Sequence, residues 1–338
     1  MNSRFGKRKI SSKGDGVIKK EKKKIVVIGG GTGIFSVLNG LKNYFDDVSA
    51  IVSMADDGGS TGILREEFGI LPPGDVRRAI VALACSDNKI LSELFNYRFK
   101  EGRGLAGHTF GNLMIAALER ITGSFDKAIK EASKIFALKG KVIPVTLQHT
   151  RLHAKLENGQ IVSKESNIDI PRHDGHLKIK KVWLKPTARL NSEAEKEILA
   201  ADLIIIGPGD LYTSLIPNLL VKGLKKSLKQ TKAKIIYFVN LMTKHGETDS
   251  FRASDFLRVL ENYLGKGVLD YVAVNSKKPA SARLRPYVSE RAYLVENDFK
   301  KTNKKPILIA ADLMRPRGFI RHDAEKTAAV VRKLLNML

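Results

Sequence analysis

The spacing of apolar and polar positions predicts an alternating α/β chain. Apolar runs rich in β-forming residues lie at 25–28, 48–54, 203–206 and 235–239, and segments with a helical spacing of apolar residues separate them. Short apolar runs bounded by glycine and polar residues are typical of buried strands in a parallel sheet, with helices as the crossovers. We therefore expect a Rossmann-like, doubly wound α/β fold with a mainly parallel sheet.

Two segments depart from this alternation. Helical periods dominate from about 76 to 138, which indicates a helical insertion. From about 141 to 185 the pattern changes to short strands with a hairpin turn at Glu157–Gln160, which predicts a small antiparallel extension. The length suits one large α/β domain, which we expect to cover residues 24–338.

The chain is strongly basic, with a formal net charge of +24. Its first 24 residues carry ten Lys or Arg and two acidic residues, a net charge of +8. We expect residues 1–23 to form a disordered basic tail, because so polar a stretch cannot bury enough apolar surface to become ordered. Attraction to nucleic acid is the alternative, but no aromatic interleaving accompanies the charge, so we expect no specific nucleic-acid partner.

The sequence points to the cytoplasm. It has no run of about 18 apolar residues that could span a membrane, and its amino terminus lacks the apolar core of a signal peptide. The single cysteine, Cys85, excludes a disulfide framework.

The run I-V-V-I-G-G-G-T-G at Ile25–Gly33 predicts a strand, a tight turn and a helix start. Its glycines let backbone N–H groups approach a phosphate at the positive end of the helix dipole. The dinucleotide fingerprint fails, because Ile34 stands where its third glycine is required, and no Gly-Lys-Ser/Thr follows to make a P-loop. Tight strand-to-helix packing alone is the alternative interpretation.

A second cluster, A-D-D-G-G-S-T-G at Ala55–Gly62, follows the next strand. The carboxyl ends of adjacent parallel strands meet at one edge of a sheet, where such folds bind ligands. Asp56 and Asp57 could accept hydrogen bonds from ribose hydroxyls, and Ser60 and Thr61 could donate to phosphate. Helix capping is the alternative role for the two acids, although a cap requires only one.

Further polar segments stand at element boundaries, and they converge on one predicted crevice. They are P-P-G-D-V-R-R at Pro72–Arg78, G-H-T-F-G-N-L at Gly107–Leu113, G-P-G-D-L-Y-T-S at Gly207–Ser214 and N-L-M-T-K-H-G-E-T at Asn240–Thr248.

Together these phrases, with G-E-T-D at Gly246–Asp249 and A-S-D at Ala253–Asp255, resemble the gluconeogenesis factor (YvcK) family of the CofD-like superfamily. The resemblance covers about residues 24–338 with every motif in order, which is far more specific than any single motif. It implies a cytoplasmic bacterial protein that binds UDP-sugars, notably UDP-N-acetylglucosamine, and is needed for envelope growth and cell shape on gluconeogenic carbon sources. No catalysed reaction is established for that family.

The resemblance also draws attention to an aromatic residue and an arginine, which Phe251 and Arg321 match. Phe251 stands where the family often has tyrosine, so a stacking face remains and a hydroxyl is lost. Ala324 replaces a threonine that is phosphorylated in some members, so we expect no such regulation there. The ligand-binding residues that we expect are Gly30, Gly31, Thr32, Gly33, Asp56, Asp57, Gly58, Ser60, Thr61, Asp75, Arg77, His108, Asn112, Gly207, Gly209, Asp210, Tyr212, Asn240, Thr243, Phe251 and Arg321.

These expectations describe a UDP-sugar-binding regulator with no catalytic residue, no metal ligand and no required cofactor. We expect a homodimer and partner proteins in envelope synthesis. The alternative is an enzyme similar to the superfamily's 2-phospho-L-lactate transferase, in which Asp56 and Asp57 could hold Mg²⁺ together with substrate phosphates. The sequence G-G-S-T-G at Gly58–Gly62 is closer to the gluconeogenesis factors than to the transferase.

Overall fold

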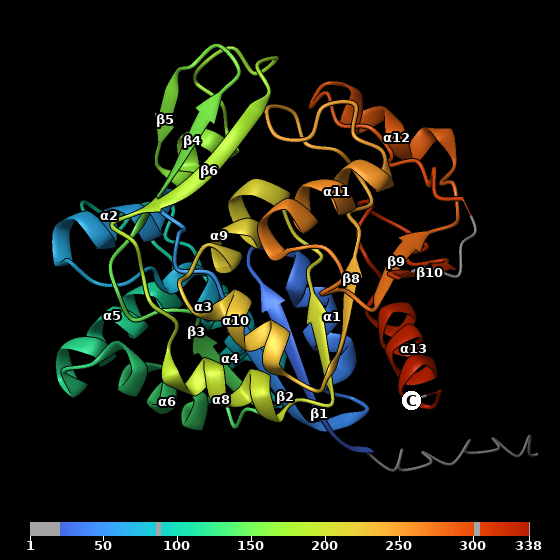
Figure 1. The fold of residues 1–338 in the computed structure, drawn as a ribbon. Helices are drawn as coiled ribbons and strands as arrows, with labels where there is room; N and C mark the ends of the chain where they lie inside the picture. Colours follow the sequence, from blue (N-terminus) through green and yellow to red (C-terminus); the bar gives the residue numbers. More distant parts are fainter. Residues whose placement is uncertain (1–20, 86–88, 301–304, 338) are drawn as a thin grey trace, which may run out of the picture.

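The computed structural model describes residues 21–85, 89–300 and 305–337, and a parallel sheet forms its centre (Figure 1). Its strands are β1 (Glu21–Gly29), β2 (Phe45–Val52), β3 (Lys141–Pro144), β7 (Leu203–Ile206), β8 (Lys234–Phe238), β9 (Tyr271–Asn275) and β10 (Ile307–Ala311). They follow the order β10-β9-β8-β7-β1-β2-β3, and every neighbouring pair is parallel. The strand order reverses direction at β1, which creates a topological switch point between β1 and β7.

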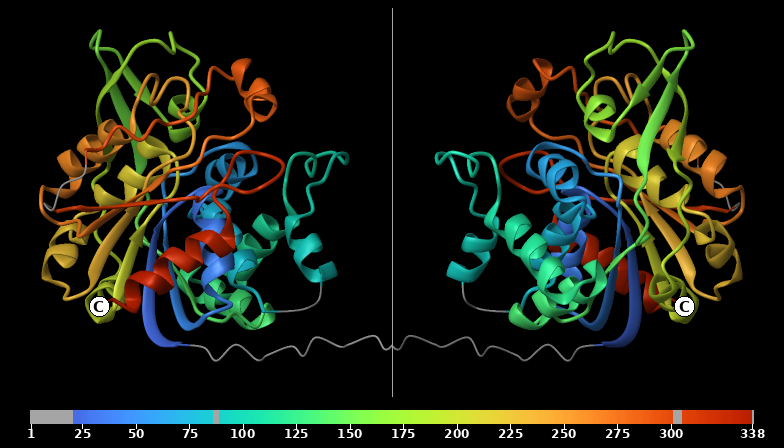
Figure 2. Two further views of the ribbon diagram at one scale, coloured as in Figure 1. Left: turned by 90° about the vertical axis from the view of Figure 1, so that its right-hand side faces the viewer. Right: turned by 90° about the vertical axis from the view of Figure 1, so that its left-hand side faces the viewer.

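Helices cover both faces of this sheet, as Figure 2 shows. One face carries α1 (Gly33–Leu41), α3 (Pro73–Leu83) and α13 (Ala324–Leu335). The other carries α8 (Ser192–Ala200), α9 (Ile216–Leu219), α10 (Leu224–Gln230) and α11 (Ala253–Leu264). Because both faces are covered, β1 reads as a continuous apolar run rather than an alternating one, and Ile25 to Ile28 are at most 1 % exposed.

The remaining helices extend this core. They are α2 (Gly59–Phe68), α4 (Lys89–Asn96), α5 (Phe110–Thr122), α6 (Phe125–Ile135), α12 (Ser281–Val288) and a π-helical turn, η1 (Leu211–Leu215). The helical segment expected at about 76–138 corresponds to α3 through α6. In that part of the chain which the structure describes, no helix is both long enough and apolar enough to cross a membrane.

A small antiparallel sheet stands above the carboxyl edge of the main sheet (Figure 1). It consists of β4 (Arg151–Leu156), β5 (Ile161–Ser163) and β6 (Ile179–Lys185) in the order β5-β4-β6, and α7 (Glu165–Asp169) lies between β5 and β6 in the chain. The predicted fold class, a mainly parallel doubly wound sheet with a helical insertion and a small antiparallel extension, is confirmed.

Two predicted boundaries were wrong. The β-rich insert was expected from about 141, but β3 at 141–144 is the edge strand of the main sheet. Val142 and Ile143 are both buried, as in a strand covered on two faces, whereas β4 alternates buried and more exposed residues. The basic tail was expected to reach residue 23, but β1 already begins at Glu21, and residues 1–20 lie outside the described residues.

Candidate functional site

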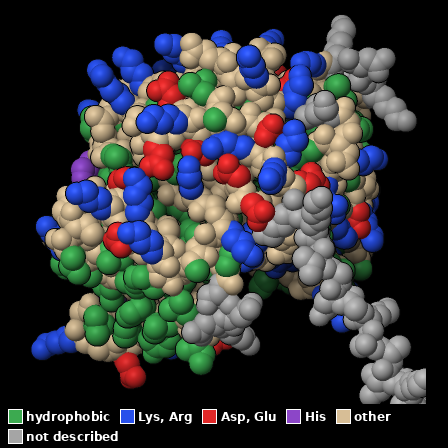
Figure 3. Space-filling model, turned by 90° about the horizontal axis from the view of Figure 1, so that it is seen from below, with side chains coloured by type: hydrophobic (Ala, Val, Ile, Leu, Met, Phe, Trp, Pro, Cys, Tyr) green, Lys and Arg blue, Asp and Glu red, His purple; other side chains and the backbone are tan. Residues whose placement is uncertain are grey.

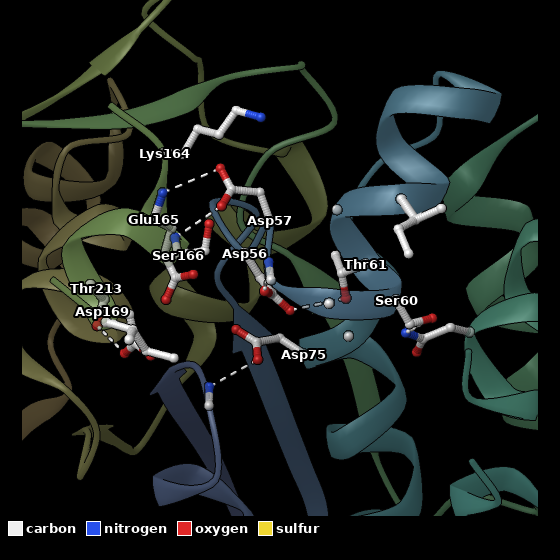
Figure 4. A pocket seen from close by; sticks show the side chains of 18 of the residues that line it. Asp56, Asp57, Ser60, Thr61, Asp75, Lys164, Glu165, Ser166, Asp169 and Thr213 are labelled. Carbon is white, nitrogen blue, oxygen red and sulfur yellow. Dashed lines mark hydrogen bonds between the residues drawn. The ribbon is translucent and has the colours of Figure 1, made fainter. Parts of the chain in front are cut away.

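A cavity of about 1050 Å³ lies at the carboxyl ends of β1 and β2, between the main sheet and the insert (Figure 4). Its volume suits a ligand of nucleotide size. Its walls come from the first glycine turn, the loop after β2, the start of α3 and the insert residues 164–172. The predicted site residues that line this large cavity are Gly31, Thr32, Asp56, Asp57, Gly58, Ser60, Thr61, Asp75, Arg77, Asn112 and Asp210.

A small pocket of about 150 Å³ continues from the large cavity toward β7 and β8. The two spaces share Gly31, Thr32, Asp210 and Ser214 in their walls. The predicted site residues that line the small pocket are Gly30, Gly31, Thr32, Gly33, Gly209, Asp210, Asn240 and Arg321. Cavity and pocket therefore meet at the topological switch point.

The glycines after β1 are required mainly by close packing. A Cβ at Gly33 would lie 2.1 Å from the Pro208 carbonyl oxygen, and one at Gly30 would lie 2.5 Å from the Asp75 carboxylate. Gly31 has a φ of 64°, which L-residues with side chains rarely adopt. Close packing thus explains why position 33 is glycine. Gly31, in addition, lines both the large cavity and the small pocket.

Two helices point uncapped N-termini at the large cavity. Thr32 precedes α1 and Gly58 precedes α2, and neither end has a side-chain cap or an acidic residue in its first turn. The first N–H groups of a helix lack intrahelical partners, and the helix dipole places partial positive charge there. Both ends can therefore bind the oxygen atoms of a phosphorylated ligand.

Asp75 joins the first glycine turn to α3. Its carboxylate accepts the N–H of Gly31 at 2.9 Å and is 2.6 Å from the Arg78 guanidinium. Arg78 also lies 3.6 Å from Asp56, whose carboxylate accepts bonds from the Gly58 N–H and, at 3.2 Å, the Thr61 hydroxyl. Burial, together with the charge of Asp75, raises the pKa of Asp56 to about 6. The cavity floor is therefore a bonded network rather than a set of free charges.

Asp57 is a helix cap, although of a distant helix. Its carboxylate accepts the backbone N–H of Glu165 at 3.2 Å and of Ser166 at 2.9 Å, in the first turn of α7 (Figure 4). Arg65 reinforces the same junction, because it donates to the carbonyl oxygens of Asp56 at 3.0 Å and Thr150 at 2.8 Å. The β2 loop thereby holds the insert in place.

A chain of hydrogen bonds forms the opposite wall. Arg77 Nε donates to Asn112 Oδ1 at 3.1 Å, and Asn112 Nδ2 donates to Ser60 Oγ at 3.2 Å. Ser60 Oγ lies 3.1 Å from His108 Nδ1. Arg77 also bonds to Asn96. All of these except Asn96 were predicted site residues; His108 is buried behind Ser60 and contacts neither space directly.

The insert contributes cavity residues that the sequence analysis missed. Lys164, Glu165, Asp169 and Arg172 line the cavity opposite the glycine turn. Burial and the nearby carboxylates, Asp56 first among them, raise the pKa of Glu165 to about 10, so its carboxyl is protonated at neutral pH and can donate a hydrogen bond. Neither glycine nor a motif marks this segment in the sequence, so only the fold brings it to the site.

Among the described residues, one group of three carboxylates is close enough to hold a metal ion: Asp169, Asp210 and Glu247. Lys244 already supplies the positive charge, because its ammonium bonds to Asp169 and lies 3.0 Å from Asp210 and 3.6 Å from Glu247. These carboxylates raise the pKa of Lys244 despite its burial. The cluster joins the insert to the loops after β7 and β8.

Several predicted site residues line neither space; they are His108, Gly207, Tyr212, Thr243 and Phe251. The backbone N–H of Tyr212 donates to Glu247 at 3.0 Å, and the Thr243 hydroxyl accepts the N–H of Tyr293. Phe251 packs edge-on against Phe256, with ring centroids 5.5 Å apart. In this structure the Thr243 and Phe251 side chains contact neighbouring protein groups, and the role of these five residues toward a ligand stays a prediction.

The comparison with protein families decides the affiliation of the chain. The model described as 2-phospho-L-lactate transferase CofD matches residues 25–314. The chain belongs to the CofD family. Within that family its relatives are gluconeogenesis factors, as the sequence motifs had indicated.

Two such relatives carry the name gluconeogenesis factor. The protein of Bacillus subtilis is 40% identical over 93% of this chain and 99% of its own length. That of Halalkalibacterium halodurans is 40% identical over 92% of this chain and 96% of its own length. A crystal structure of a Bacillus halodurans protein superposes with a TM-score of 0.87 at 40% identity, covering 92% of this chain and 100% of the other.

Proposed function

We propose that this CofD-family chain binds a nucleotide sugar, UDP-N-acetylglucosamine or a related one, and acts as a regulatory protein. The observation that carries the proposal is the pair of uncapped helix N-termini, α1 and α2, that face one cavity at the switch point. A diphosphate placed there would satisfy N–H groups from both helices. The names of the relatives support a role in gluconeogenesis. We propose that this role includes envelope growth and cell shape on gluconeogenic carbon sources.

Two hydroxyl groups around the cavity are bonded within the protein. The Thr61 hydroxyl donates to Asp56, and Ser60 Oγ accepts from Asn112 and lies 3.1 Å from His108 Nδ1. A serine beside a histidine is also how a nucleophile is activated, so product formation decides between binding and turnover. UDP-N-acetylglucosamine recovered unchanged after incubation with the protein would support the regulatory role.

A second candidate is a transferase of the kind that the family description names. The raised pKa values of Asp56 and Glu165 favour it, since burial and, after it, the charges of neighbouring carboxyl groups cause them. A divalent cation bound between such groups and the ligand's phosphates would relieve the repulsion. Magnesium-dependent consumption of a nucleotide-activated phospholactate would establish this function in place of the regulatory one.

The decisive experiment adds a negative charge where the phosphate is expected. Thr32→Asp places a carboxylate at the N-terminus of α1, which stabilises a helix by about 0.3–1 kcal/mol but repels a phosphate. We expect isothermal titration to show at least about tenfold weaker UDP-N-acetylglucosamine binding with no fall in melting temperature. Wild-type binding should persist in the presence of a chelator.

The matched control is Ser124→Asp, at the N-terminus of α6. Ser124 also makes no side-chain cap in the structure, and it lines neither the cavity nor the pocket. This variant should gain similar stability and keep wild-type affinity. Equal affinity for all three proteins would refute the placement of the phosphate.

We also propose that the protein acts in the cytoplasm as a homodimer and contacts proteins of envelope synthesis. Lys and Arg side chains are scattered among acidic ones on the underside, while apolar side chains gather at one edge (Figure 3). Ile90 and Leu94 on α4 and Ile121 on α5 are exposed apolar residues that a second copy would cover. Ile121→Asp should then lower the mass measured by sedimentation to that of a monomer.

A further inference from the structure

The small pocket combines apolar side chains with hydrogen-bonding groups. Pro208, Leu241, Met242 and Ile320 line it together with the glycine turns, Asn240 and His322, and Asp210 and Arg321 lie in its wall. The large cavity continues from it toward the helix N-termini and Arg77 and Arg78. The small pocket can therefore take a flat group that carries hydrogen-bonding atoms, while the charged part of the same ligand lies in the large cavity.

His322 is a buried polar side chain in this pocket. It is 6 % exposed, and its Nε2 has no hydrogen-bond partner. Burial lowers its pKa to about 4, so the imidazole is neutral, and a hydrogen bond to the Val239 carbonyl occupies its other nitrogen. The Phe238 ring meets the imidazole edge-on at 6.4 Å. Nε2 is therefore a fixed acceptor without a donor.

Asn240, on the loop after β8, is a second residue with a buried, unpartnered acceptor. Its Oδ1 is buried and has no partner, and its side chain lines the same pocket. Leaving a buried acceptor unpaired costs free energy, and nearly all such atoms in proteins find a partner. Two in one pocket indicate that an external N–H or O–H group completes them.

We propose that the small pocket holds the nucleobase of the ligand, and that His322 Nε2 accepts a hydrogen bond from a ring N–H of that base, while Asn240 Oδ1 accepts one from a ribose hydroxyl. Uracil presents such an N–H at N3, whereas cytosine presents a lone pair there. The pocket thus selects uracil over cytosine by chemistry rather than by size. This inference rests on the proposed function and specifies how its site reads the base.

The test compares two ligands that differ only in the base. Affinities for UDP and CDP are measured by isothermal titration on the wild-type chain and on His322→Phe, which keeps the ring against Phe238 but removes the acceptor. We expect the wild-type protein to prefer UDP by at least about tenfold, as for other sites built to pair a polar group. In His322→Phe the two affinities should come within about threefold of each other through loss of UDP binding.

Tyr237→Phe is the matched control. The Tyr237 hydroxyl is also buried without a partner, one residue before Phe238 on β8, but it does not line the pocket. This variant should keep the full preference for UDP. Circular dichroism would establish that both variants are folded, and His322→Leu removes the same acceptor if His322→Phe does not fold.

The possible results distinguish failure of the base assignment from failure of the proposed nucleotide-sugar binding. Wild-type protein that binds neither UDP nor UDP-N-acetylglucosamine would refute the proposed function. Wild-type protein that binds UDP and CDP equally, or a folded His322→Phe that still prefers UDP, would overturn the base assignment while nucleotide binding stands. A sugar in the small pocket would produce that equal binding.

Discussion

The two parts of the site are built in opposite ways. In the large cavity the polar side chains are already bonded to one another: Asp75 holds Gly31 and Arg78, and Asp57 holds the start of α7. In the small pocket His322 and Asn240 each keep an acceptor without a partner. The bonds in the large cavity fix the shape of the site before a ligand binds. The unpartnered acceptors in the small pocket remain available to bond to a ligand, so they can select which ligand binds.

Because of this difference, stability measurements should report on the large cavity and binding measurements on the small pocket. Changes in the bonded network of the large cavity should appear first in stability, because the network joins segments that are distant in sequence. Changes at the two unpartnered acceptors of the small pocket should appear first in ligand choice, since these atoms make no bond to the protein. The expected effects below test this division, from the largest to the smallest.

The largest effect should come from Asp75→Asn. Asp75 is buried, and the change leaves the Arg78 guanidinium without its close carboxylate. We expect a loss of about 3 kcal/mol in unfolding free energy, as for a broken buried pair. Asp255→Asn is a fair comparison, because Asp255 also pairs with an arginine at i+3 and 2.6 Å but at an exposed surface. It should cost under about 1 kcal/mol, and equal losses in urea titrations would contradict the argument.

Arg321→Ala and Phe251→Ala should have separate effects. Arg321 is exposed and lines the small pocket, so its loss should weaken UDP-sugar binding by about 1–3 kcal/mol with little change in stability. Phe251 packs against Phe256, so its truncation should cost about 2 kcal/mol of stability and leave affinity unchanged. Calorimetric binding and melting curves on both variants measure this. If folded Phe251→Ala lost affinity, Phe251 would instead stack on the ligand, as its match to an aromatic position of the family suggests.

Stability should fall in mild acid partly through His322. A histidine whose pKa is lowered to about 4 in the folded state contributes stability that is complete above about pH 6.5 and is lost as the pH falls toward 4. Between pH 7 and pH 5 we expect the wild-type protein to lose about 2 kcal/mol more than His322→Phe does. Urea titrations of the two proteins at both pH values give this difference directly, and identical pH slopes would show that His322 is charged or hydrated in the folded state.

Asp57→Ala should have the smallest effect on the global fold, about 1 kcal/mol, as for a lost helix cap. The sequence analysis expected this position to affect the ligand more than folding. Its two bonds to the N–H groups of α7 now favour a local effect on the insert. Hydrogen exchange should show faster exchange at residues 164–170 and unchanged rates in β1 and β7, whereas unchanged protection of α7 together with weaker ligand binding would favour the original expectation.

Local pattern in the sequence was sufficient for the central strands of the main sheet, β1, β2, β7 and β8, whereas β9 and β10 were not predicted. The apolar run at 203–206 is strand β7 to the residue, and the glycine turn after β1 is where the spacing placed it. Such features depend on neighbours in the chain, which a sequence displays directly. The same local reading assigned β3 to the insert, because a four-residue strand carries too little pattern to show which sheet it joins.

The walls of the site were less predictable because they depend on distant contacts. Asp57 was found through its motif, but its partners Glu165 and Ser166 lie 108 and 109 residues away. Lys244 was part of a recognised segment, yet nothing local shows that Asp169 would be its partner across the cavity. His322 was not among the predicted site residues, since an unpartnered atom can be identified only when its surroundings are known.

The contact between the two glycine turns has a consequence for how the protein is made. The turns after β1 and β7 meet through backbone atoms, and Asn218 donates to the Gly29 carbonyl across a sequence separation of 189 residues. Contacts between such distant segments close late, because the chain between them must first be synthesised and arranged. The glycine turn after β1 is therefore synthesised long before residues 320–322, and only their arrival completes the small pocket.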